Sequence, residues 1–399
     1  MYAICIINTS GNYGGAEKRF VSLFEHVNSE RNDFLLIINK ALYDQMTEKG
    51  ILTSHERVRV IDIPFDHKSY PGSKHSDDLN VSVKKTNPLR TFLGRRKYFL
   101  KTVFQWLIFS GQLNRILKKH DVRTVYAVWQ GGIWGRVRFK KLNIRIIYGA
   151  NSNLVWHLGK DLLNRFDSQY RILRDANHVD FLSTGLVEEL KGLMPPEDFP
   201  ESYSVSPCSF IDYQKFYPAQ PKENSVVFMG RLVALKNPML FLEAVKIFNT
   251  RYNGSADIGF YVLGTGPEET NMRVFAGNNE LTNVSFEGKV TDPQKYLKRS
   301  KVFISIQQTE NYPGQALMEA MACENAVIVS DVGETRKLVA DEEGILVPLD
   351  AETIASALAE LLSDEEGLRL KGKNAREKVM KEHTVEHFKE YFYKLTCHN

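Results

Sequence analysis

The chain has 399 residues, of which 43% are hydrophobic and 25% are charged, as in an ordinary soluble protein. This length is too great for one hydrophobic core and predicts two domains of about 200 residues each. No apolar run approaches the ~20 residues that a transmembrane helix needs. An apolar strand directly follows Met1, which predicts no signal peptide, and four scattered cysteines without metal-ligand spacing favour a reducing compartment such as the cytoplasm.

Charge is distributed unevenly along the chain. The net charge is only +4, yet the segment from Leu79 to Lys160 carries 17 Lys or Arg residues and one acid, Asp121. The remainder of the chain is therefore net acidic. This asymmetry predicts an anionic partner for the first half of the chain.

The chain opens with an apolar strand at 2–8, a Gly-rich turn and an amphipathic helix. Backbone N–H groups at such a helix start can hold a phosphate or another ligand. The spacing of Gly11, Gly14 and Gly15 is not that of dinucleotide dehydrogenases, and no acid follows about 20 residues on at a second strand. A plain tight turn is the alternative interpretation.

Strands are predicted at 34–39 and 58–63, followed by a polar loop at about 66–90 and a helix at 91–119. Basic and aromatic residues alternate at the start of this helix, which suits contact with anionic lipid headgroups. An ordinary core-facing helix with a solvated basic face is at least as compatible with the pattern. No nucleic-acid-binding module is recognisable, so no nucleic-acid partner is expected.

A strand at 123–128 begins a further strand, turn and helix unit, and the strand after it ends near Asn151. This residue is a candidate polar contact, and a turn residue is the alternative. The Pro-rich stretch 217–225 is the best linker. It divides the chain into domains at 1–217 and 218–383, and an amphipathic aromatic helix at about 384–399 completes the sequence.

The second half opens with a strand, a polar turn and a helix, and the turn carries Arg231 and Lys236. Two positioned cations could stabilise the charge that develops on a leaving diphosphate, although solvated surface cations are the alternative. A later loop holds Val290 and Asp292. The loop-and-N-cap interpretation explains these two residues equally well.

The stretch from Ser305 to Gly333 contains a strand end, a polar loop, a helix and a second apolar strand. The loop carries Glu310, Asn311 and Gly314, and the helix opens with Gln315 and bears Glu319 on an apolar background. A helix N-terminus tolerates carboxylates through its dipole and can also hold an anionic ligand. The alternative is a solvated Glu310 and a capping or salt-bridged Glu319.

The runs LMEAMAC and SDVGET, the GRL-x3-K spacing of Arg231 and Lys236, and the GGAE turn together resemble family 4 retaining glycosyltransferases of the GT-B fold. Two departures occur. Eight residues rather than seven separate Glu310 from Glu319, so Asn311 could fill the first motif position. Glu324 stands where the family has the helix-ending Gly, and we expect Asn325 to supply the left-handed cap instead.

The resemblance implies a role for each candidate residue. Arg231 and Lys236 would hold the donor diphosphate, Glu319 the ribose hydroxyls, and Glu310 with the backbone around Gly314 the sugar. Catalytic assignments are Arg231, Lys236 and Glu310. The donor side would be completed by Gly15, Val290, Asp292, Asn311 and Gln315, and the acceptor side by Gly14 and Asn151. The resemblance implies no metal and no cofactor other than the nucleotide-sugar substrate.

The expected architecture is α/β, with two Rossmann-like domains whose parallel sheets face a central cleft and with the last helix packing back on the first domain. The implied function is retaining transfer from a UDP- or GDP-sugar to a saccharide in surface polysaccharide or glycoconjugate assembly. The basic region 79–160 favours a lipid-linked acceptor at the inner face of the cell membrane. A nucleotide-sugar epimerase of related fold and a non-catalytic partner subunit are the alternatives.

Overall fold

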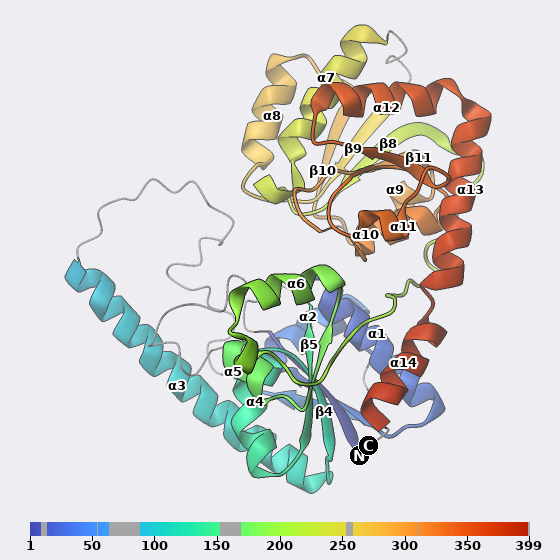
Figure 1. The fold of residues 1–399 in the computed structure, drawn as a ribbon. Helices are drawn as coiled ribbons and strands as arrows, with labels where there is room; N and C mark the ends of the chain where they lie inside the picture. The colour runs from blue at the N-terminus through green and yellow to red at the C-terminus, as the bar shows by residue number, and fades with distance from the viewer. Residues whose placement is uncertain are drawn as a thin grey trace. The chain divides into compact units, whose positions relative to one another are not determined.

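The computed structural model describes residues 1–8, 14–53, 55–63, 88–151, 169–252, 258–310 and 312–397, which form two compact units (Figure 1). Unit 1 comprises Met1–Pro207 together with Lys389–Asn399, and unit 2 comprises Cys208–Phe388. Residues 208–217, which the sequence analysis assigned to the first domain, group with unit 2.

Unit 1 contains a seven-stranded parallel sheet with the strand order β3-β2-β1-β4-β5-β6-β7. Parallel neighbours require crossover connections, and helices supply most of them here. The central strands are buried on both faces, which explains their continuous apolar runs. The strands are β1 (Tyr2–Ile7), β2 (Phe34–Asn39), β3 (Val58–Ile61), β4 (Thr124–Trp129), β5 (Arg145–Ala150), β6 (His178–Phe181) and β7 (Tyr203–Val205).

The helices of unit 1 are α1 (Gly15–Glu30), α2 (Lys40–Glu48), α3 (Pro88–Lys119), α4 (Gln130–Lys141), α5 (Gln169–Asp175) and α6 (Thr184–Leu193), with a 3-10 turn η3 (Pro196–Asp198) before β7. The long helix α3 packs its second half on the core through Phe109, Leu113 and Leu117. None of the helices within the described ranges is long and apolar enough to cross a membrane.

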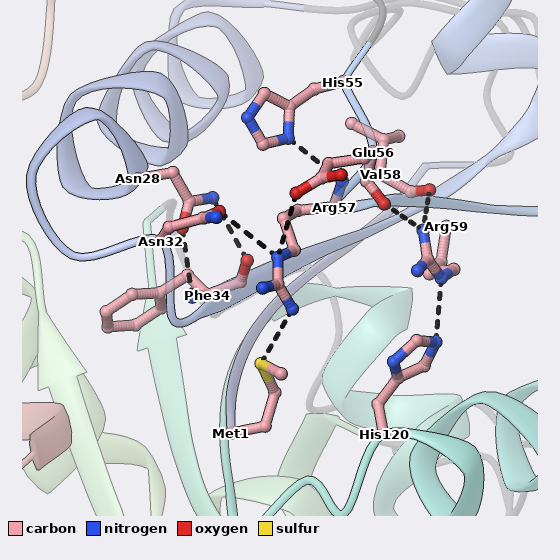
Figure 2. Close-up of polar contacts among 10 residues, drawn as sticks. All are labelled: Met1, Asn28, Asn32, Phe34, His55, Glu56, Arg57, Val58, Arg59 and His120. Carbon is pink, nitrogen blue, oxygen red and sulfur yellow. Dashed lines mark hydrogen bonds and ion pairs between the residues drawn. The ribbon is translucent and has the colours of Figure 1, made fainter.

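A polar cluster secures the starts of the strands in unit 1 (Figure 2). The Asn28 side chain pairs with both backbone groups of Phe34, at 3.0 and 3.1 Å. Arg57 donates to Asn32 at 3.2 Å, and Arg59 donates to the ring of His120 at 2.9 Å. These residues lie at the amino ends of the strands, opposite to the edge at which parallel sheets bind ligands. We therefore assign Arg57 and Arg59 a structural role rather than a role in ligand binding.

The last helix, α14 (Val385–Cys397), begins in unit 2, and its residues from Lys389 onward belong to unit 1. Within unit 1, Lys389 forms an ion pair with Glu30, and the Tyr391 hydroxyl donates to the fully buried carboxylate of Asp180. Arg145 also donates to the carbonyl of Leu395 at 2.9 Å. The chain therefore passes between the two units twice.

Unit 2 contains a six-stranded parallel sheet with the order β10-β9-β8-β11-β12-β13. Along β11, Val302 and Ile304 face one apolar cluster, and Phe303 faces another on the opposite side of the sheet. The predicted α/β class with two parallel sheets is confirmed. The strands are β8 (Glu223–Met229), β9 (Gly259–Leu263), β10 (Val284–Gly288), β11 (Ser300–Ser305), β12 (Ala326–Ser330) and β13 (Gly344–Val347).

The helical elements of unit 2 are η4 (Ala234–Lys236), α7 (Pro238–Arg251), α8 (Glu269–Asn278), α9 (Gln294–Leu297), α10 (Gln315–Ala322), α11 (Thr335–Leu338), α12 (Ala351–Ser363) and α13 (Glu365–Glu382). Just beyond β9, Gly264 adopts a φ of 138°, and a Cβ atom there would lie 1.8 Å from the Gly230 carbonyl oxygen. Glycine is therefore required where the segments after β8 and β9 meet.

Candidate functional site

The candidate residues of unit 2 follow the carboxyl ends of three strands. Arg231 and Lys236 follow β8, Val290 and Asp292 follow β10, and Glu310 follows β11. Carboxyl ends of parallel strands share one edge of the sheet, where ligands of open α/β sheets bind. A small hollow at this edge is lined by residues that include Met229, Lys236, Ser305, Ile306, Gly314 and Gln315.

A clamped turn fixes the position of Lys236. The 3-10 turn η4 ends at this lysine, and the next residue, Asn237, is left-handed with a φ of 50°. Asn237 donates from its side chain to the carbonyl of Ile306 at 3.0 Å, and Gln308 donates from its backbone to Leu235 at 2.9 Å. The side chain of Gln308 adds a third bond, to Asn237, at 3.0 Å. The segment after β11 therefore holds the turn in place.

The Lys236 ammonium donates a hydrogen bond to the side-chain oxygen of Gln307. Burial, and secondarily the Arg231 charge, lower the pKa of Lys236 to about 8. Gln307 is itself buried, donates to the carbonyl of Glu310, and accepts from Ser330 through its own carbonyl at 2.8 Å. A neutral amide thus holds the lysine, and among the described residues no carboxylate forms an ion pair with it.

Arg231 follows the carboxyl end of β8, at the same edge of the sheet. Its side chain is exposed, and the backbone around it is fixed to the segment after β9 by Gly230 donating to Leu263 at 3.0 Å and Leu232 donating to Thr265 at 3.1 Å. Its charge lowers the pKa of Lys236, so the two predicted cations are electrostatically coupled.

The carboxylate of Glu310 is engaged by backbone groups. It accepts the N–H of Tyr312 at 2.9 Å and that of Glu334 at 3.0 and 3.1 Å, one bond at each oxygen. Gly333, which has a φ of 52°, packs so closely that a Cβ atom there would lie 2.6 Å from the carboxylate. Glu310 therefore ties the loop before α10 to the turn after β12. Sequence spacing did not reveal this contact.

Helix α10 opens at the hollow, with Gly314 as its N-cap and Gln315 as its first residue. The Gln315 side chain donates to the Glu319 carboxylate at 3.2 Å, so these two predicted donor residues are brought together on one helix face. The first N–H groups of a helix lack intrahelical partners and carry partial positive charge. Asn311, which the sequence analysis also proposed in the loop before α10, lies outside the described residues.

The cap at the end of α10 differs from the expectation. Glu324, not Asn325, is left-handed, with a φ of 58°. The N–H of Asn325 bonds to Ala320 at 3.2 Å and that of Glu324 to Met321 at 2.9 Å, which is a Schellman motif. The Asn325 side chain is buried and donates to the Ser300 carbonyl, so packing uses this amide for another purpose.

Val290 and Asp292 lie further from the hollow and do not contribute to its lining. Val290 is half-buried and packs on the apolar cluster that includes Leu297. The Asp292 carboxylate accepts from Gln294 at 3.3 Å and pairs with Lys295 at 3.4 Å. The Gln294 hydrogen bond and then Lys295 lower the pKa of Asp292.

In unit 1, Gly14 and Gly15 lie at the start of α1, as the turn pattern predicts. The sequence analysis missed Glu17, whose buried carboxylate accepts from the Asn8 side chain at 2.6 Å and from the Gly14 N–H at 2.9 Å. Its spacing of three residues from the N-cap, as in a capping box, is the signal that could have found it. Asn8 also pairs with the Asn39 side chain, at 3.0 Å.

Asn151 follows β5 and is anchored on both sides. Its side-chain oxygen accepts from the buried guanidinium of Arg19 on α1, and its amide donates to the Gly149 carbonyl at 2.9 Å. Gly14, Gly15 and Asn151 thus all lie beyond the carboxyl ends of β1 and β5 in one sheet. Across the described part of the chain, no three His, Cys, Asp or Glu side chains gather so that they could hold a metal ion.

Solved structures with this two-sheet architecture span almost the whole chain. Sucrose-phosphate synthase from Thermosynechococcus elongatus superimposes with a TM-score of 0.72 at 18% identity, over 99% of this chain and 97% of that one. Anabaena HepE in complex with UDP gives a TM-score of 0.71 at 14% identity, over 99% of both chains. At this identity the likeness establishes the fold, and the protein has the GT-B fold.

The sequence comparisons name the family. The model of the family described as glycosyl transferases group 1 matches residues 210–378. A curated relative, an α-1,4-N-acetyl-D-galactosaminyltransferase of Campylobacter jejuni, is 28% identical over 193 residues, which are 48% of this chain and 53% of the relative. The match therefore spans about half the length of that relative. Residues 210–378 belong to the glycosyl transferases group 1 family.

Proposed function

We propose that the protein is a retaining glycosyltransferase that moves a sugar from a nucleoside-diphosphate sugar to a saccharide acceptor. The observation that carries this proposal is the Lys236 ammonium, which a neutral amide holds beside Arg231 at the hollow where α10 begins. Two cations and a helix N-terminus form an electrostatic site for a diphosphate that gains negative charge as it leaves.

The remaining roles are proposed from the family resemblance. Glu319 binds the ribose hydroxyls, and the backbone around Gly314 contacts the donor. Glu310 shapes the loop between them through its bonds to Tyr312 and Glu334. Unit 1 binds the acceptor near Gly14 and Asn151.

Retention requires no protein nucleophile in this proposal. The acceptor hydroxyl attacks the anomeric carbon on the face that the diphosphate leaves, the bond from that carbon to the diphosphate oxygen breaks, and the same oxygen takes the hydroxyl proton. Lys236 and Arg231 neutralise the departing diphosphate, so we expect transfer to proceed without a divalent metal. Unchanged activity in EDTA would support this part, and a requirement for Mg²⁺ or Mn²⁺ would contradict it.

The acceptor class is proposed from chemistry and from a relative. The name of the Campylobacter relative describes a substrate in which an oligosaccharide is linked to undecaprenol diphosphate. The basic segment 79–160 suits such an anionic, lipid-linked saccharide at the inner membrane face. The HepE structure contains UDP, which makes a UDP-sugar the first donor to test.

The test is a thermal-shift screen of the whole chain against UDP, GDP, ADP and CDP. A ligand at a hundredfold excess over its Kd stabilises the folded state by ~2.7 kcal/mol. We expect one diphosphate to raise Tm for the wild type and for Lys246→Ala, an exposed control on α7, but not for Lys236→Ala. No shift with any diphosphate would favour a non-catalytic partner subunit, and turnover of the sugar nucleotide without acceptor would favour an epimerase.

A further inference from the structure

The contact between Gln307 and Lys236 has an unusual chemistry. A buried lysine is ordinarily paired with a carboxylate, because an ammonium that loses water needs a compensating charge. Here the Lys236 ammonium donates to the amide oxygen of Gln307, a buried neutral group. Glu310, the acid three residues after Gln307, directs its carboxylate to the N–H groups of Tyr312 and Glu334 instead.

The orientation of the Gln307 amide is fixed from both ends. Its nitrogen donates to the carbonyl of Glu310, so its oxygen must face the lysine. The backbone of Gln307 is held by Ser330, which donates to its carbonyl at 2.8 Å. An amide held in this way can accept from an ammonium but cannot neutralise it.

We propose that Gln307 is a positioning residue of the donor site, whose amide oxygen holds the Lys236 ammonium at the hollow as an uncompensated charge for the donor diphosphate. This inference rests on the proposed function and adds a residue that motif spacing does not identify. The residue acts through Lys236 and need not touch the substrate.

The arrangement sets the pH dependence of diphosphate binding. Arg231 is the charged group that affects Lys236, and the lining from β11 and α10, such as Ser305 and Gln315, is uncharged. Without ligand the pKa of Lys236 is about 8, and a bound diphosphate raises it. Between pH 7 and 9.5, affinity should therefore fall as pH rises through about 8, because binding then requires uptake of a proton.

Gln307→Glu tests the proposal because it replaces the neutral acceptor with a carboxylate of the same shape. The carboxylate neutralises the ammonium and raises its pKa, so diphosphate affinity at pH 7.5 should fall by about tenfold or more. The fall of affinity with pH should also move to higher pH. Thr309→Glu adds the same charge two residues away on an exposed side chain and is the matched control.

Gln307→Ala provides a second variant if the carboxylate impairs folding. It removes the acceptor without adding charge, so affinity should again fall, while the pH at which affinity declines stays near or below that of the wild type. Kd is measured by calorimetric titration at several pH values from 7 to 9.5, with the diphosphate selected from UDP, GDP, ADP and CDP. Thermal unfolding of each variant shows whether it is folded.

The outcomes separate the two proposals. Loss of affinity in both Gln307 variants, with the decline moved to higher pH only in Gln307→Glu, and little change in Thr309→Glu, supports the positioning role. Wild-type affinity and pH profile in Gln307→Glu would overturn it and leave the donor site intact. A wild-type chain that binds none of the four diphosphates would overturn the proposed function itself.

Discussion

Two lysines of unit 2 have the same pKa and different purposes. Burial lowers the pKa of both Lys222 and Lys236 to about 8. The Lys222 ammonium donates to the carbonyls of Ser300 and Cys323, both at 2.7 Å, and thereby closes the end of α10. Lys236 donates instead to the Gln307 amide beside the hollow. Lys222 therefore satisfies two backbone carbonyls, whereas the Lys236 ammonium lies where we propose that the donor diphosphate binds.

This contrast predicts opposite effects of the same substitution. A folded-state pKa below the unfolded value means that the unfolded chain binds more protons between pH 8 and 10.5, so each lysine costs stability below pH 8 and the cost disappears as pH rises. Lys236→Met should therefore raise the free energy of unfolding at pH 7 by ~1 kcal/mol while abolishing diphosphate binding. Lys222→Met should lower it by ~1–3 kcal/mol, because two carbonyls lose their donor.

Urea unfolding of both variants at pH 7 and 9.5 measures these effects. The gain from Lys236→Met should shrink at the higher pH, where the wild-type lysine is neutral. A Lys236→Met protein that is less stable than the wild type at pH 7 would show that the ammonium contributes to folding and would contradict this prediction.

Glu310 allows a second prediction at the residue scale. Glu310→Gln turns an acceptor of the Tyr312 and Glu334 N–H groups into an amide that presents a donor to one of them. We expect a loss of ~1–3 kcal/mol in the free energy of unfolding together with weaker diphosphate binding, because the loop before α10 loosens. Lost activity with unchanged stability would instead assign Glu310 to contact with the sugar alone.

At the scale of elements, helix α3 exposes an apolar stripe. Leu100, Phe104 and Leu107 are 67%, 51% and 55% exposed and recur at the spacing of one helix face. The same helix carries Arg115, Lys118 and Lys119 and lies in the strongly basic segment 79–160. Apolar and basic side chains together suit the surface of an anionic membrane.

The stripe predicts binding to vesicles. Sedimentation with vesicles of phosphatidylglycerol and phosphatidylcholine should retain the wild type, and the triple variant Leu100→Ser, Phe104→Ser, Leu107→Ser should lose about tenfold in affinity. Neutral phosphatidylcholine vesicles and 0.5 M salt should weaken wild-type binding, since screening removes the electrostatic part. Equal binding of wild type and triple variant would exclude the stripe as the contact.

Sequence patterns predicted elements well because their signals are local. Continuous apolar strands alternating with amphipathic helices indicated parallel sheets, and parallel sheets place all strand ends at one edge. The left-handed residue after α10 was misassigned to Asn325, because intrinsic preference favours asparagine, whereas the hydrogen-bond geometry of the helix end places Glu324 there. Tertiary context overrode a weak local preference.

The site was predicted less completely, for the same physical reason. Arg231, Lys236 and Glu319 could be proposed as candidates because each belongs to a short motif. The partners that set their chemistry are distant in the chain: Gln307 meets Lys236 across 71 residues, and Glu310 meets Glu334 across 24. No periodicity links such pairs, so only the fold shows that one lysine is held by an amide and one carboxylate by backbone.

At the scale of the whole molecule, the two units differ in their relation to the proposed chemistry. Every lining residue of the hollow comes from unit 2, and so do Arg231, Gln307 and Glu310. Unit 2 has its own six-stranded sheet with apolar clusters on both faces. Its two chain ends meet within the unit, where Phe210 packs on Phe388 with ring centroids 5.4 Å apart.

These features predict that residues 208–388 fold alone and retain the diphosphate site. The fragment should unfold cooperatively in urea. It should bind the selected diphosphate within about threefold of the full-chain Kd, because it retains every described residue that lines the hollow. It should transfer no sugar, since acceptor residues are assigned to unit 1. Lys236→Ala in the fragment is the control for specific binding. A folded fragment that binds more than tenfold more weakly would show that unit 1, at Gly15 or elsewhere, contributes directly to the donor.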